Sequence, residues 1–169
     1  TDSSSQVTEE AEGLDAEANN VISTPPSITV TSNPADLQVI SINLPESCVA
    51  GQFMPLTWTV ANVGTGPTNV STWSDRVYLS NSPTFNAGTA VQVGTFSRSG
   101  VLAAAGGYVA AQQVRVPLNF SGNYYVYVTT DSGSSVQECS AESNNQTRST
   151  ETFNAISMPP DLQIVPDSI

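Results

Sequence analysis

The stretch LTWTVANVGTGP, residues 56–67, is the part of the chain that decides its fold class. Apolar and polar side chains alternate along its first half, which is the pattern of a β-strand with one buried face. We expect Leu56, Trp58, Val60 and Val63 to point inward. The two glycines and the proline that follow predict a turn. The stretch therefore predicts a half-buried strand that ends in a tight turn.

Strand patterns of the same kind recur on both sides of this stretch. Each is bounded by glycine, proline or asparagine, which favour turns. The other segments predicted as strands are LQVISI (37–42), RVYLS (76–80), VQVGTF (91–96), YVAAQQVRVPL (108–118), YYVYVTT (124–130) and TETFNAIS (150–157). About seven strands in about 125 residues, with no helix between them, predict an all-β fold, an antiparallel β-sandwich.

Two facing sheets would bury one face of each predicted strand around a common core. In the longest predicted strand, Val114, Val116 and Leu118 are expected to share one face. Five aromatic residues are expected to form the aromatic part of this core. These are Trp58, Trp73, Phe96, Tyr125 and Phe153.

The charge of the chain excludes several classes of function. The chain has 4 Arg, no Lys and no His against 15 acidic residues, a formal net charge of −11. Such a chain repels a polyanion, so we exclude nucleic acid as a partner. The absence of His excludes a His-based catalytic triad and imidazole-based zinc or copper sites. Glu138 and Glu142 are the candidate glycosidase pair, but a small sandwich offers little cleft for a sugar, so we predict no enzymatic activity.

Two short motifs recur at the same distance along the chain. PADLQVI at 34–40 resembles PPDLQIV at 159–165, with the shared Asp-Leu-Gln displaced by 125 positions. AEANN, ending at Asn20, resembles AESNN, ending at Asn145, and this pair is displaced by 125 positions as well. Two matches at one offset indicate tandem repeats, against the alternative of a coincidence between polar segments.

The offset divides the chain into three parts. Residues 1–35 are interpreted as the tail of a preceding copy, 36–160 as a complete copy and 161–169 as the start of the next. We expect ITVT (28–31) to be a strand separated from its parent sheet. Taken alone, the six acids and no bases of the first part would instead suggest a disordered acidic tail. Because a repeat has neighbours, adjacent copies are the expected partners.

Cys48 and Cys139 indicate an oxidising compartment, since an even pair of cysteines in a Lys-free, Ser/Thr-rich chain is typical of exported proteins. We predict a disulfide between them within the domain, and the alternative is a bond between adjacent copies or chains.

No apolar run of about 18 residues occurs, so no transmembrane span is expected. No signal peptide is visible, so an export signal would lie outside this segment.

The segment DSGSSVQECSAESNN, residues 131–145, carries the densest group of polar side chains. Carboxylate and amide oxygens are hard ligands, of which calcium takes about six to eight. The candidate calcium ligands are Asp131, Glu138, Glu142, Asn144 and Asn145. In the alternative interpretation, the asparagines satisfy backbone groups of an irregular loop and the glutamates lie in solvent. Outside this segment, Asp75 is expected to accept backbone hydrogen bonds or to pair with an arginine.

Six segments between Asp36 and Asn145 follow the order of a known family. They are DLQVISI, AGQFMPLTWTVANVGTGPT, WSDRVYLS, SGVLAAAGGY, VPLNFSGNYYVYVTTD and VQECSAESNN. Through them the chain resembles the CARDB domain, the cell-adhesion-related domain found in bacteria. The resemblance implies an immunoglobulin-like sandwich that occurs in tandem in large extracellular prokaryotic proteins, and adhesion or scaffolding with no known reaction. The chain departs from the family pattern in its two cysteines and in AAAGG (103–107), where a Pro-Gly turn is common.

These observations give one leading functional hypothesis and two alternatives. The leading hypothesis is a non-enzymatic structural or adhesive repeat of an extracellular surface protein, whose partners are adjacent repeats and a cell-surface protein or polysaccharide. In the first alternative, the loop 131–145 makes the chain a calcium- or glycan-binding module. In the second, the chain is an assembly subunit that exchanges its N-terminal strand with the sheet edge of a neighbouring chain.

Overall fold

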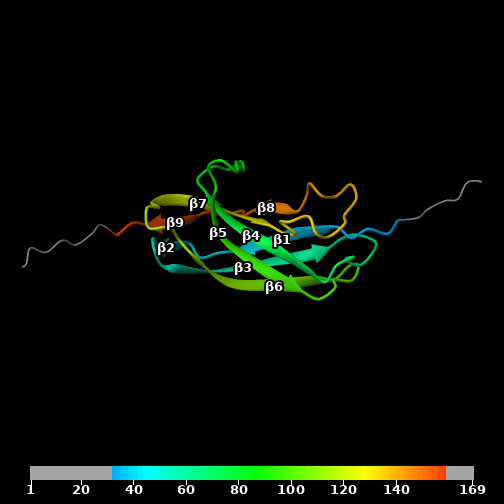
Figure 1. Cartoon of the computed structure of the whole chain (residues 1–169). Helices are drawn as coiled ribbons and strands as arrows, with labels where there is room; N and C mark the ends of the chain where they lie inside the picture. Colours follow the sequence, from blue (N-terminus) through cyan, green and yellow to red (C-terminus); the bar gives the residue numbers. More distant parts are fainter. Residues whose placement is uncertain (1–31, 159–169) are drawn as a thin grey trace, which may run out of the picture. The chain divides into compact units, whose positions relative to one another are not determined.

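The structure is a computed structural model and describes residues 32–158. This part of the chain contains nine β-strands arranged in two sheets (Figure 1). The first sheet has the order β1 (Leu37–Asn43), β3 (Phe53–Asn62), β6 (Gly107–Arg115). The second has the order β2 (Ser47–Val49), β9 (Phe153–Ile156), β7 (Gly122–Thr129), β4 (Thr72–Ser80), β5 (Val91–Ser99), and β8 (Gln146–Arg148) also pairs with β7. The predicted all-β sandwich is confirmed.

The strand pairs are antiparallel except β2 and β9, which run parallel. β2 and β8 are not among the predicted strands, because three residues are too few to show an alternating pattern. The predicted strand at 28–31 lies outside the described residues. Within residues 32–158, no helix is long and apolar enough to cross a membrane.

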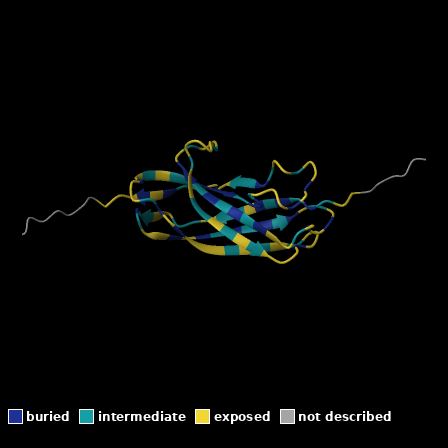
Figure 2. Cartoon of the chain, viewed as in Figure 1, coloured by how far each residue is buried: buried dark blue, intermediate teal, exposed yellow. Residues whose placement is uncertain are grey.

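Alternating side chains of the strands build the core between the sheets (Figure 2). In β3, Met54, Leu56, Trp58 and Val60 are buried, while the residues between them are more exposed. The same cluster contains Val77 and Leu79 of β4, Val126 and Val128 of β7, Val114 and Val116, and Phe153 of β9. The predicted core positions of Trp58, Trp73 and Phe153 are confirmed, and Phe96 packs against this core while partly buried.

Three predicted inward positions are wrong. Tyr125 lies on the outer face of β7, where Arg148 stacks on its ring at 4.6 Å, because the neighbouring valines of the strand face the core. Leu118 is 76 % exposed because β6 ends at Arg115 and the chain then turns. Val63 is 52 % exposed, since the alternation of β3 continues to a buried asparagine, Asn62, and not to the next valine.

Candidate functional site

The segment that leads into β1, residues 33–36, is held by the turn that follows β3; we call it the lead segment. The backbone N–H groups of Thr65 and Gly66 both donate to the carbonyl of Pro34, at 3.1 and 3.0 Å, and the N–H of Val63 donates to the carbonyl of Asp36 at 2.8 Å. The predicted turn at 64–67 is therefore also a clamp for the incoming chain.

The two glycines of this turn are there because the lead segment approaches so closely. A Cβ atom on Gly66 would lie 1.9 Å from the carbonyl oxygen of Asn33, and one on Gly64 would lie 2.5 Å from that of Pro34. Real Cβ atoms do not come that near backbone atoms, so only glycine permits the contact. The sequence GTG is thus explained by packing as well as by the turn itself.

Asn62, at the end of β3, fixes the clamp from inside. Its side chain is fully buried, and its Oδ1 accepts hydrogen bonds from the N–H groups of Asp36 and Gly64, at 3.0 and 3.1 Å. Its Nδ2 donates to the carbonyls of Gly66, Leu102 and Ala103. One side chain therefore joins the lead segment, the turn after β3 and the loop before β6.

The loop 131–145 packs on the other side of the lead segment. Oε1 of Glu138 accepts a hydrogen bond from the N–H of Leu37 at 2.6 Å, and Nδ2 of Asn144 donates to Oδ1 of Asp36 at 3.0 Å. The Asp-Leu-Gln motif and the motif that ends at Asn145 recur at the same offset in the sequence, and the structure brings them into contact. The recurring residues therefore build the point where the chain joins the domain.

Two of the five candidate calcium ligands are used by the loop itself. The carboxylate of Asp131 accepts hydrogen bonds from the N–H groups of Ser135 and Val136, at 3.0 and 2.8 Å. Oε1 of Glu142 accepts one from the N–H of Glu138 at 3.0 Å. Backbone groups of the irregular loop are thus satisfied by Asp131 and Glu142, whereas the alternative interpretation gave that role to the asparagines and placed the glutamates in solvent.

The other three candidates leave buried oxygen atoms without a hydrogen-bond donor: Oε2 of Glu138, Oδ1 of Asn144 and Oδ1 of Asn145. Glu138 is only 1 % exposed and Asn145 6 %. Burial raises the pKa of the Glu138 carboxyl, and the nearby carboxylates of Glu142 and Asp131 raise it further, although Asn145 and the Leu37 N–H lower it. The electrostatics therefore favour a proton or a cation at Glu138.

A metal ion at this loop would need amide oxygens among its ligands. Over residues 32–158, no three Asp, Glu, His or Cys side chains are grouped so that they could hold a metal ion. One carboxylate oxygen and two amide oxygens are nevertheless the hard ligands that calcium prefers. These donor types are those of a calcium site and not of a zinc or copper site.

The structure does not bring Cys48 and Cys139 together, and the bond predicted within the domain is absent from it. Cys48 lies in β2 beside Ala155 of β9, whereas Cys139 lies in the loop that contacts Leu37. Figure 1 places these two regions at opposite ends of the sandwich. The two cysteines are apart because β2 runs parallel to β9, away from the loop. The alternative bond between copies or chains stays a prediction.

A second polar centre, buried between the sheets, was not expected from the sequence as a side-chain network. Oδ2 of Asp75 accepts a hydrogen bond from Nε1 of Trp58 at 2.7 Å, and the hydroxyl of Tyr108 donates to both carboxylate oxygens, at 2.9 and 2.8 Å. Burial raises the pKa of Asp75, and burial together with this carboxylate raises the pKa of Tyr108. Trp73, Asp75 and Val77 are alternate residues of β4, so they face the same side of the sheet. This alternation was the sequence signal that could have located the network.

Asp75 accepts hydrogen bonds from side chains of the core and, as one of the two expectations had it, from the backbone of Asp131, and it is not paired with an arginine. Arg98 of β5 instead covers the network from the edge, 5.5 Å from the ring of Trp73 and 4.9 Å from that of Tyr108. Because its oxygens are already occupied by donors, Asp75 is not placed to act as a general base.

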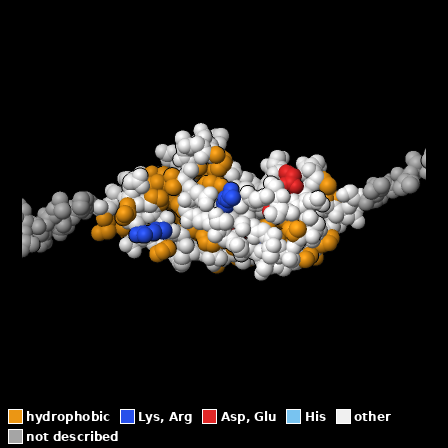
Figure 3. All heavy atoms as spheres, viewed as in Figure 1, with side chains coloured by type: hydrophobic (Ala, Val, Ile, Leu, Met, Phe, Trp, Pro, Cys, Tyr) orange, Lys and Arg blue, Asp and Glu red, His pale blue; other side chains and the backbone are white. Residues whose placement is uncertain are grey.

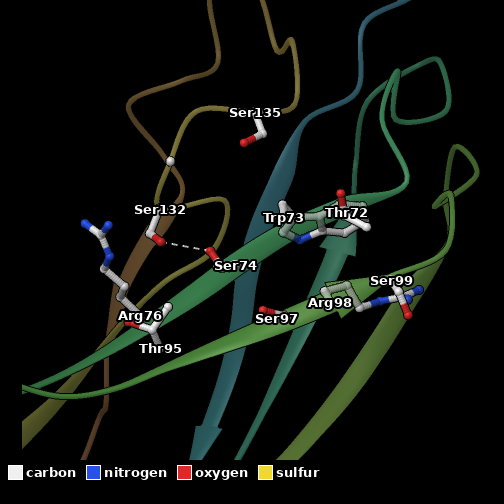
Figure 4. Close-up of a pocket in the computed structure, with 11 residues that line it drawn as sticks. Thr72, Trp73, Ser74, Arg76, Thr95, Ser97, Arg98, Ser99, Ser132 and Ser135 are labelled. Atoms are coloured by element: carbon white, nitrogen blue, oxygen red, sulfur yellow. Dashed lines mark hydrogen bonds between the residues drawn. The ribbon is translucent and has the colours of Figure 1, made fainter.

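The outer face of β4 and β5 carries a hydroxyl-lined hollow of about 550 Å³ (Figure 4). The loop 131–145 forms one wall, where Oγ of Ser132 donates to the carbonyl of Ser74 at 2.9 Å. Trp73 lies beneath it but is only 4 % exposed, so it offers no ring face on which a sugar could stack. The hollow has no nucleophile paired with a base, so it gives no support for catalysis.

Comparison with known proteins places these features in a family. A family model named CARDB matches residues 34–149. No curated protein matches the chain. The CARDB domain of the PF1109 protein from Pyrococcus furiosus, in complex with di-metal ions, is 20 % identical, with a TM-score of 0.53, and the match covers 76 % of this chain and 100 % of that one. Its solution NMR structure gives 20 % identity, a TM-score of 0.52 and coverages of 74 % and 98 %.

Proposed function

The chain belongs to the CARDB family, and on this basis we propose that it is a load-bearing repeat module of a large extracellular adhesion protein, without enzymatic activity. In such a protein its task is to hold binding regions away from the cell surface and to transmit tension between them. Its partners are the adjacent copies, and the array as a whole meets a cell-surface protein or polysaccharide.

The observation that carries this proposal is the path of the chain. It enters beside the turn at 64–66 and leaves after β9, at the opposite end of the sandwich (Figure 1). We call these the leading end and the trailing end. Copies joined in this way would lie in a row, each adding the long dimension of one module to the array.

The strand pairing suits a chain that is pulled from both ends. Tension applied to the lead segment acts along β1, and the hydrogen bonds from β1 to β3 are perpendicular to it. The pairing runs from Leu37–Asn62 to Asn43–Thr57 with one register shift between Val39 and Ser41. At the other end, β9 is held by β2 on one side and β7 on the other. The bonds of each strand are therefore loaded together and not one after another.

Stretching the full chain from its two termini tests the proposal. We expect the module to resist until it ruptures in a single step, because all β1–β3 bonds share the load. Single-molecule force measurement at constant pulling speed checks this. Gradual extension with no abrupt rupture would show that the module does not carry tension, and the load-bearing function would then be wrong.

A second candidate function is calcium binding, and the three buried oxygens without donors in the loop 131–145 favour it. The related domain from Pyrococcus furiosus is described as a complex with di-metal ions, which adds support for a cation in this family. Bound calcium would neutralise Glu138 and fix the loop against Leu37, so it would stiffen the leading end.

We expect millimolar calcium to raise the melting temperature of the chain above its value in EDTA. Calcium at about 100 times its dissociation constant would add roughly 2.7 kcal/mol to the free energy of unfolding. The rise should vanish in Glu138→Gln and persist in Glu46→Gln, which removes one exposed charge outside the loop. Equal responses of the two variants, or no response of the native chain, would exclude a calcium site at Glu138.

A further inference from the structure

We infer that the trailing end of the module packs directly against the leading end of the next copy through an apolar joint. The inference rests on the repeat function proposed above and names the surface by which neighbouring copies meet. It follows from the length of the connection, from the exposed side chains at the two ends and from the clamp that holds the lead segment.

The connection between copies is very short. SMPPDLQ at 157–163 repeats SNPADLQ at 32–38, with Ser, Pro, Asp, Leu and Gln identical and the same displacement of 125 positions. Residues 158–161 therefore correspond to the lead segment of the next copy. Since β9 ends at Ile156, Ser157 alone separates the last strand of one copy from the clamped segment of the next.

The preceding junction has the same length in the sequence. Displaced by the same 125 positions, ITVT at 28–31 corresponds to FNAI at 153–156, the residues of β9. Ile28 and Val30 then align in sequence with Phe153 and Ala155, which are buried in β9, so both segments carry apolar residues at these two positions. Residues 28–31 lie outside the described part of the chain, and the correspondence is one of sequence.

This spacing leaves no room for a flexible linker. One or two residues of extended chain span at most about 7 Å. In the copy that is described, the carbonyls of Asn33 and Pro34 lie against the glycines of the turn at 64–66. If the next copy clamps residues 158–161 in the same way, its turn must lie against the trailing end of this one.

The trailing end presents an apolar surface for such a contact. Three backbone hydrogen bonds bring three segments together there. They run from Ala50 N to Ile156 O at 2.9 Å, from Gly51 N to Val116 O at 2.8 Å and from Val116 N to Gln52 O at 3.0 Å. The large apolar side chains exposed on or beside these segments are Phe53 (63 %), Leu118 (76 %), Ile156 (46 %) and Met158 (72 %). Figure 3 shows hydrophobic side chains gathered at this end.

The leading end is complementary in character. Val63 and Val101 are exposed there by 52 % and 59 %, the first beside the clamp and the second beside Leu102, whose carbonyl Asn62 binds. Arg115 lies at the trailing end and Glu142 in the loop at the leading end, so one pair of opposite charges is available across the joint. A second copy therefore matches the trailing end in position and polarity.

A tandem protein tests the joint. A second copy of residues 36–160 is inserted after Pro160 of the full chain, which gives the order 1–160, 36–160, 161–169. This protein keeps the native junction between its two copies and leaves the trailing end of the second copy uncovered. The double substitution Phe53→Ser and Leu118→Ser is then placed either in the first copy, at the junction, or in the second copy, at the uncovered end. The two variants have the same composition, so they differ only in whether the altered surface is covered.

We expect the substitutions in the first copy to lower the melting temperature and to let the two copies tumble independently, as measured by NMR relaxation. The same substitutions in the second copy should leave the tumbling as in the unsubstituted tandem. Equal effects at both places would overturn the apolar joint, and the load-bearing function would stand if the pulled module still ruptured abruptly.

Discussion

Replacing Trp58 by alanine is expected to lower the free energy of unfolding by about 3–5 kcal/mol, the usual loss for a large aromatic removed from a core. Trp58 is fully buried in β3, packs against Phe96 at a centroid distance of 5.5 Å and donates to Asp75. The substitution would leave a cavity and a buried carboxylate with one donor fewer. For a domain of this size, we expect the melting temperature to fall by roughly 10–20 °C.

Tyr125→Ala provides the matched control, because the sequence placed this aromatic residue in the core and the structure places it on the outer face. Its ring contacts Arg148, and an exposed cation–π pair contributes about 0.5–1 kcal/mol. Urea unfolding of the two variants measures the difference. A larger loss for Tyr125→Ala than for Trp58→Ala would mean that β7 is turned over relative to the structure described.

Asn62→Ala is expected to produce the second large effect, a loss of at least about 2 kcal/mol. The side chain satisfies two backbone N–H groups and three backbone carbonyls, and its removal would leave several of them buried without a partner. Each unsatisfied buried group costs about 1–3 kcal/mol. Because the clamp would loosen, hydrogen exchange should accelerate at the amides of Asp36, Thr65 and Gly66.

Asn86→Ala is the corresponding control at an exposed site. Asn86 also accepts a backbone hydrogen bond, from the N–H of Gly88 at 2.8 Å, but it lies in an exposed loop. A surface substitution of this kind should change the free energy of unfolding by less than about 0.5 kcal/mol. If Asn62→Ala were as mild as Asn86→Ala, and the three amides stayed protected, the clamp would not depend on Asn62.

The parts of the fold that could be predicted from the sequence are those that depend on alternation. The inward positions of Leu56, Trp58 and Val60 follow from a period of two, and so does the burial of Phe153. The same rule failed at the ends of strands. The sequence pattern does not show that β6 stops at Arg115, which is why it predicts an inward Leu118. It also does not show that Asn62, and not Val63, takes the last buried position of β3.

The candidate site was only partly predictable, because its contacts join segments far apart in the chain. The common offset singled out Asp36 and Asn145, and the structure shows that the two motifs touch. Nothing in the sequence indicates that Glu138 bonds to Leu37 across 101 positions, or that the glycines after β3 receive the lead segment. The burial of Asp75 depends on the pairing of β4 with its neighbours, which a single sequence does not reveal.

The direction of loading tests the load-bearing function most directly. In a chain without its native cysteines, handles at both termini load β1 along its length, whereas handles at the N-terminus and at Thr65→Cys pull β1 and β3 apart at the leading end, one bond after another. We expect the first arrangement to rupture at a distinctly higher force than the second, at the same pulling speed. Equal rupture forces in the two directions would contradict the account, because the strand pairing would then give no resistance to tension between neighbouring copies.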